Sequence, residues 1–131
     1  MKSLLYLRLL TDGQTIAYGN PVLEQVKKDF PEVAVLDADS QSGELVLHYA
    51  QKLLQEPGQT IVCFDSAAAD AGFGSLLPLI ELLLEGQPEQ RILFRNTHHR
   101  LLRMVQARPE LHAELVQHDA ELLQKIKLYL T

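Results

Sequence analysis

Four short runs of apolar residues recur along this chain, and their centres lie about 30 residues apart, the length of a strand–helix–strand unit. The runs occupy residues 4–10, 33–36, 61–64 and 91–94, and each is short and contains β-branched or aromatic residues, as buried strands do. A helical apolar pattern fills each gap. Units of this kind build parallel sheets whose right-handed crossovers place helices on the sheet faces. We therefore expect a single α/β domain over residues 1–131, with about four mostly parallel strands alternating with helices.

Residues 60–86 combine a β-rich run, a loop of small residues and a helix that is apolar on nearly every side. Ser75 is a candidate N-cap for this helix and Gly86 a candidate stop, while Glu81 and Glu85 are its only clearly polar residues. A helix that apolar needs cover on more than one side, so we expect it to pack inside the domain.

Caps and apolar stripes predict the remaining helices. The pair Asn20-Pro21 is typical of a helix start, Ser42 is a candidate cap after the second run, and Asn96-Thr97 after the fourth. The tail from residue 110 onward predicts a last amphipathic helix packed on the sheet. Its apolar stripe consists of Leu111, Leu115, Leu122 and Ile126.

Charge and cysteine content limit the classes of function. The chain has 12 Lys and Arg against 17 Asp and Glu, a formal net charge of −5, which disfavours a nucleic-acid or anionic membrane surface. Cys63 is the only cysteine and lies within an apolar run, so we expect a buried, inert thiol. The first apolar run contains Arg8 and lacks a cleavage site, and no apolar stretch approaches the roughly 20 residues of a membrane span. We therefore expect a cytoplasmic protein with no membrane partner.

Acidic residues follow the apolar runs where a parallel sheet gathers its ligands, at the carboxyl ends of its strands. Asp37 and Asp39 follow the second run, and Asp65 follows the third. Carboxylate oxygens hold Mg²⁺, so these three residues form a candidate metal site if the two strands are neighbours. The alternative is that the aspartates only end strands and begin turns. No other cofactor is expected.

Two phosphate-handling classes lack their signatures. A receiver-like phosphoacceptor site needs an acidic pair after the first strand and a lysine after a later one. Here Thr11-Asp12 follows the first run and no lysine follows the fourth. Neither G-x-G-x-x-G nor G-x-x-x-x-G-K-[ST] occurs, so the sequence contains no glycine-rich phosphate loop of these kinds.

A positive cluster surrounds the predicted start of the helix after the fourth run. A helix N-terminus favours anions, so this cluster is a candidate site for a phosphate or an acidic partner. The alternative is an ordinary solvated face. The candidate residues are Arg95, Thr97, His98 and Arg100, with His99 and Arg103 close in sequence.

The features of residues 60–105 follow a recognisable order. A strand ending in Asp65 precedes the loop residues Asp-Ala-Gly-Phe-Gly at 70–74, then a leucine-rich helix, a strand at 92–94 and Asn96. This order resembles the second half of a STAS domain, the fold of anti-sigma-factor antagonists and of sulphate-transporter tails. The resemblance implies a small regulatory domain that binds a protein partner and is not an enzyme. The serine that the family phosphorylates precedes the first glycine of its motif, and Ala71 occupies that place here.

The same loop favours a partner site on physical grounds, because small residues let another surface approach closely. We expect partner-binding residues at Asp70, Phe73, Gly74 and Ser75, together with the exposed edge of the following helix. Two positions remain open for Phe73, the tip of the loop or the core. Our first hypothesis is a non-catalytic regulatory or protein-interaction domain that binds another protein or a second copy. The alternative is a small-ligand or Mg²⁺-dependent phosphate-chemistry domain that uses the three aspartates.

Overall fold

The computed structural model describes residues 2–10, 20–40, 42–55, 59–66, 71–85, 90–96, 98–108 and 112–130. Five parallel strands form one sheet in the order β2-β1-β3-β4-β5. The strands are β1 (Lys2–Leu9), β2 (Ala34–Asp39), β3 (Gln59–Ser66), β4 (Gln90–Asn96) and β5 (His112–Leu115). The helices are α1 (Pro21–Asp29), α2 (Glu44–Gln55), α3 (Leu77–Leu84), α4 (His99–Gln106) and α5 (Asp119–Leu130), and a short 3₁₀ turn, Gly74–Leu76, precedes α3. The predicted α/β class is confirmed, with one strand more than expected.

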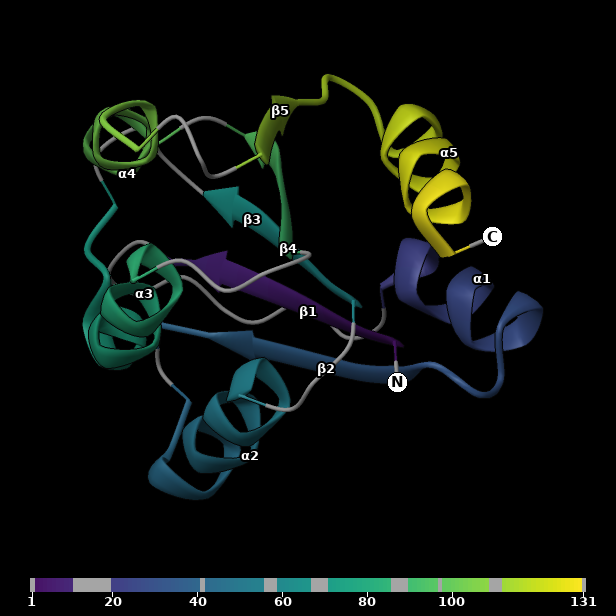
Figure 1. The fold of residues 1–131 in the computed structure, drawn as a ribbon, viewed down its shortest axis with the longest axis horizontal. Helices are drawn as coiled ribbons and strands as arrows, with labels where there is room; N and C mark the ends of the chain where they lie inside the picture. Colours follow the sequence, from purple (N-terminus) through teal and green to yellow (C-terminus); the bar gives the residue numbers. More distant parts are fainter. Residues whose placement is uncertain are drawn as a thin grey trace.

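The helices cover both faces of the sheet. α1 and α5 lie on one face, and α2, α3 and α4 lie on the other (Figure 1). Successive residues of β1 alternate between the two layers, with Leu5 and Leu7 in the core under α2–α4, and Leu4 and Tyr6 in the core under α1 and α5. The strand order is that of flavodoxin-like sheets, in which the winding reverses between β1 and β3. Ligands of such sheets bind near that point, beyond the carboxyl ends of the strands.

α1 begins where the sequence predicts. The Oδ1 atom of Asn20 accepts hydrogen bonds from the amides of Val22 and Leu23, at 3.1 and 3.3 Å, and a proline occupies the first turn. Val22, Leu23 and Val26 are buried in the core shared with α5. The predicted cap of this helix is therefore confirmed.

The other candidate caps have different roles. Ser42 Oγ accepts a hydrogen bond from the amide of Asp39 at 2.9 Å, and α2 begins further along the chain. Asn96 belongs to β4, and His98 caps α4 in its place. Ser75 lies in the 3₁₀ turn, and α3 has no side-chain cap. Short polar side chains accept backbone hydrogen bonds in turns and at strand ends as well as at helix starts, which explains the differences.

β2 is longer than predicted and contains two of the candidate metal ligands. In the sheet register Asp37 pairs with Tyr6 of β1, and Asp39 pairs with Arg8. Asp37 therefore lies inside the strand, where we expected it to follow the strand's end, whereas Asp39 is the last residue of β2. A run of apolar residues marks only the part of a strand whose two faces are both covered, so its polar end is missed.

β5 is absent from the sequence prediction, because four residues are too few to show an alternating pattern. The last helix consequently begins at Asp119, and the prediction that it runs on from residue 110 is wrong. Leu122 and Ile126 are buried as the predicted stripe requires, whereas Leu115 belongs to the strand and is 54 % exposed. Leu111 lies outside the described residues.

Cys63 is fully buried in the middle of β3, and burial raises the pKa of its thiol above the usual range. The expectation of a buried thiol is therefore confirmed. Of the helices in the described ranges, none is long and apolar enough to cross a membrane.

Candidate functional site

The carboxyl ends of three neighbouring strands carry a row of charged residues. Asp39 of β2, Arg8 of β1 and Asp65 of β3 occupy one register position across the sheet. Arg8 also donates from Nη2 to Asp37 Oδ2 at 3.2 Å. The predicted metal site requires β2 and β3 to be neighbours, but β1 lies between them and places a guanidinium there. No group of three or more His, Cys, Asp or Glu side chains in the described ranges could hold a metal ion.

Both oxygens of the Asp65 carboxylate have partners inside the protein. Tyr6 Oη donates to Oδ2 at 2.7 Å, and Asn96 Nδ2 donates to Oδ1 at 2.6 Å. Burial, and then the hydrogen bond to Asp65, raise the pKa of the Tyr6 hydroxyl above its usual range. Asp65 thus joins β1, β3 and β4 to one another, which is a structural role.

Asp37 lies in an environment that disfavours its charge. Partial burial raises the pKa of its carboxyl, Asp39 and Asp65 add to the shift, and Arg8 opposes it. The Arg8 guanidinium therefore does not fully offset the effect of burial on the pKa of Asp37.

The sequence predicts Arg95 as part of the anion site, but the structure separates it from Arg100. Its Nε atom donates to Asp119 Oδ1 at 2.8 Å, an ion pair that joins the end of β4 to the first turn of α5. This hydrogen bond raises the pKa of Arg95. The guanidinium is therefore engaged on the α1/α5 face of the sheet, while α4 lies on the opposite face (Figure 1). Thr97, another candidate residue of that site, lies outside the described residues.

His98 is buried, with 3 % of its surface exposed, and links two segments of the chain. Its Nδ1 atom accepts a hydrogen bond from the amide of Leu101 at 3.2 Å and so caps α4. Its Nε2 atom lies 2.5 Å from the carbonyl oxygen of Ala71. Because Nδ1 accepts, the proton is on Nε2 and is donated to that carbonyl. The imidazole therefore ties the segment after β3 to the start of α4.

Phe73 occupies the core alternative of the two positions left open by the sequence. It is 7 % exposed and packs in the hydrophobic layer under α2–α4. Its ring lies 5.0 Å from the His98 ring, and the Arg100 guanidinium lies over it at 5.1 Å. An apolar ring next to a capped helix start buries more area inside the fold than at a loop tip, which accounts for its position.

Gly74 and Ser75 are held against the end of β2. The carbonyl oxygen of Ser40 accepts hydrogen bonds from the amide of Ser75 at 2.9 Å and from its hydroxyl at 3.1 Å. Gly74 has φ +53°, and a Cβ atom there would collide with the same carbonyl oxygen. These two candidate partner residues therefore fix the turn before α3, and the fourth, Asp70, lies outside the described residues.

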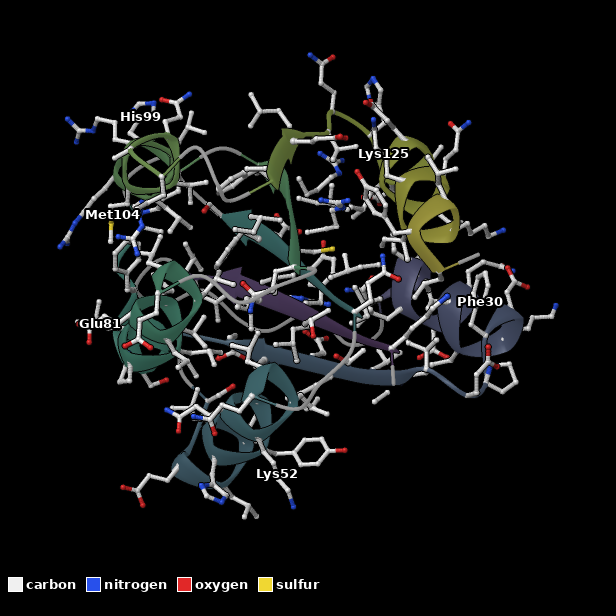
Figure 2. The ribbon with its side chains drawn as sticks, viewed as in Figure 1. Phe30, Lys52, Glu81, His99, Met104 and Lys125 are labelled. Atoms are coloured by element: carbon white, nitrogen blue, oxygen red, sulfur yellow. The ribbon has the colours of Figure 1, made fainter. Side chains whose placement is uncertain are left out.

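A pocket of about 340 Å³ lies between residues 71–73 and α4. Arg100 and Arg103 contribute guanidinium groups to it, and the described part of the chain contains no carboxylate paired with either. His99 lies on one side of α4, and Met104 lies on the side that faces α3 (Figure 2). The full lining consists of Ala71, Gly72, Phe73, His98, His99, Arg100 and Arg103.

A second hollow, of about 600 Å³, lies between α2 and α3. Leu45, one of the lining residues, is 84 % exposed, and Leu77, at the start of α3, is 38 % exposed. α3 is therefore covered on its Leu79, Ile80 and Leu83 side and remains partly open on the other. The lining consists of Glu44, Leu45, Leu47, His48, Gln51 and Pro78, and we call it the α2–α3 groove.

Sequence reasoning overlooked residues with central roles in this region. Tyr6 and Arg8 interrupt the first apolar run at alternate positions, a signal that they share one face of the sheet. Ser40 carries no signal in the sequence. Its amide donates to the carbonyl of Arg8 at 2.9 Å, and its Oγ accepts from the amide of Leu10 at 3.0 Å, so it also closes the end of β1.

Comparison of the chain with family models, with curated proteins and with solved structures gives no match. We therefore infer function from the geometry of the described residues.

Proposed function

We propose that this chain is a non-catalytic regulatory domain that binds a protein partner, in keeping with the STAS-like order of features in residues 60–105. The observation that carries the proposal is the α2–α3 groove, where leucines stand exposed on adjacent helices. The polar strand ends, where an enzyme of this topology gathers its chemistry, are instead engaged with one another through Arg8–Asp37 and Tyr6–Asp65.

The groove has the composition of a binding surface. Its lining combines three apolar residues, Leu45, Leu47 and Pro78, with three polar ones, Glu44, His48 and Gln51. Interfaces between proteins likewise combine apolar and polar residues. Single exposed leucines are common, but here Leu45 and Leu77 are exposed on two helices that pack against each other beside one hollow.

The partner that fits this surface is a different protein that presents apolar side chains flanked by basic residues. The whole chain carries a net charge of −5, and Glu44 lies at the groove itself. A basic segment is attracted to such a surface, whereas a second copy brings the same net negative charge. Weakening of binding by salt is therefore expected.

Leu45→Glu tests the proposal, with Leu128→Glu as the matched control. Leu45 is 84 % exposed on α2 and Leu128 is 69 % exposed on α5, on the other face of the sheet. Because both side chains are exposed, each change is expected to alter the free energy of unfolding by less than about 0.5 kcal/mol. A protein captured by the tagged wild type is identified and purified, and its affinity for all three proteins is measured by calorimetry.

We expect Leu45→Glu to weaken binding of that purified partner at least about tenfold, and Leu128→Glu to leave it unchanged. Equal affinities for the three proteins contradict the proposal. Sedimentation of the wild type as a dimer that Leu45→Glu dissociates also contradicts it, because the groove is then filled by a second copy.

A further inference from the structure

We infer that the pocket between residues 71–73 and α4 binds the phosphate group of a small ligand. This site is separate from the α2–α3 groove, and the inference does not depend on the partner proposed there. It revises the anion site predicted from the sequence, because Arg95 is engaged elsewhere and His98 is an internal cap. The candidate phosphate-binding side chains of the pocket lining are His99, Arg100 and Arg103.

The first observation is an uncompensated cluster of positive charge. Arg100 and Arg103 are three residues apart on α4, and His99 and Arg103 are four apart, so all three side chains lie on neighbouring parts of one helix face. No carboxylate of the described chain is paired with either arginine, whereas Arg8 and Arg95 each have an acidic partner. Like charges at this spacing repel, and a bound anion removes the repulsion.

The second observation is that the walls of the pocket are already fixed. The Arg100 guanidinium lies 5.1 Å from the centre of the Phe73 ring, a contact that orders it without using its N–H donors. Phe73 in turn belongs to the core. The His98 ring spans from the carbonyl of Ala71 to the amide of Leu101, which holds the two sides of the pocket together. Binding therefore requires little reorganisation of the backbone.

The chemistry of the lining matches a phosphate monoester. Two guanidinium groups carry about two positive charges, and a phosphate monoester carries about −1.5 to −2 at neutral pH. Guanidinium forks donate to phosphate oxygens in pairs. Of the first-turn amides of α4, that of Leu101 already donates to His98 Nδ1, while those of His99 and Arg100 have no acceptor within the helix. A volume of about 340 Å³ is of the size that small ligands occupy.

The test is a titration of the intact protein with inorganic phosphate, followed by two-dimensional amide NMR. The variant is Arg100→Ala with Arg103→Ala, and the control is Arg91→Ala. Arg91 also lies over an aromatic ring, at 5.5 Å from the centre of Tyr129, and it is not part of the pocket lining. Variant and control thus both remove a guanidinium stacked on a ring. Arg100 and Arg103 are exposed, so the fold is expected to persist, and the amide spectrum itself reports whether it does.

We expect saturable shifts confined to residues 71–73 and 98–103 in the wild type and in Arg91→Ala. The double variant is expected to bind at least about tenfold more weakly, since each lost arginine removes charge-assisted hydrogen bonds. Equal phosphate affinity in the double variant, or no saturable shift in the wild type at tens of millimolar phosphate, overturns the inference. Ribose 5-phosphate and a phosphoserine peptide are then compared. Tighter binding of the sugar phosphate supports a small ligand, and tighter binding of the peptide overturns that assignment.

Discussion

Replacement of Gly74 by alanine is expected to destabilise the fold strongly, while the same change at Gly72 is tolerated. Gly74 has φ +53°, in the left-handed region, and a Cβ atom there would come closer to the Ser40 carbonyl oxygen than side chains do. That oxygen accepts two hydrogen bonds from Ser75, so it cannot move aside without weakening them. A Cβ atom built on Gly72 meets nothing within 4 Å.

The magnitude follows from these contacts. A left-handed backbone costs a residue other than glycine about 1–2 kcal/mol. Weakening of the two hydrogen bonds to Ser40 costs roughly 0.5–1.5 kcal/mol each. We therefore expect Gly74→Ala to lower the free energy of unfolding by about 2–5 kcal/mol. In a domain of this size the midpoint of thermal unfolding then falls by roughly 6–20 °C.

Urea unfolding followed by circular dichroism measures the effect for the wild type, Gly74→Ala and Gly72→Ala. The control is expected to remain within about 0.5 kcal/mol of the wild type. If Gly74→Ala is as stable as Gly72→Ala, the turn before α3 is not fixed on Ser40. The structural role assigned to Gly74 and Ser75 is then refuted.

Two substitutions and one thiol-labelling experiment test further contacts of the sheet. Tyr6→Phe removes the buried hydroxyl that donates to Asp65 and is expected to lower the free energy of unfolding by roughly 1–2 kcal/mol. A urea midpoint equal to that of the wild type would refute this. The hydrogen bond from Lys125 lowers the pKa of Glu114 in the folded protein. The ionised pair therefore contributes its full stabilisation at pH values above the unfolded pKa of Glu114, and this stabilisation is lost as the pH falls through the folded pKa. Glu114→Gln should therefore lower the free energy of unfolding by under about 1 kcal/mol at pH 7 and leave it unchanged near pH 2. A difference from the wild type that does not vary with pH would contradict this. Cys63 should react with Ellman's reagent only after unfolding, because its side chain is fully buried and burial raises the pKa of its thiol. Prompt reaction of the native protein would contradict the buried position of Cys63.

The fold class is predictable because apolar periodicity reports what each element buries. The runs around Leu7, Ile61 and Leu93 are long enough to mark central strands, and the spacing between them fixes the parallel connection. β5 has only four residues at the sheet edge, and one of them, Leu115, is exposed, so its pattern carries no period. Strand order depends on contacts between distant segments, which no local pattern reports.

The candidate site is predictable only in part, for the same reason. The sequence places Asp37 and Asp65 at strand ends, but their separation follows from the position of β1 between β2 and β3. The sequence predicts Arg100 for an anion site, and the structure places it in the lining of a pocket beside α4. Two other contacts are long-range: the hydrogen bond between His98 and Ala71, and the one that joins the turn before α3 to the end of β2 through Ser40.

The most direct test of the account is a titration of the protein with Mg²⁺, followed by amide NMR. Asp37 is paired with Arg8, and Asp65 with Tyr6 and Asn96, whereas we propose that ligands and partners bind on the side of α2, α3 and α4. We therefore expect millimolar Mg²⁺ to leave the amide signals of Asp37, Asp39 and Asp65 unchanged. Saturable shifts at these residues, abolished by Asp65→Asn, would show a working metal site at the strand ends and would contradict the account.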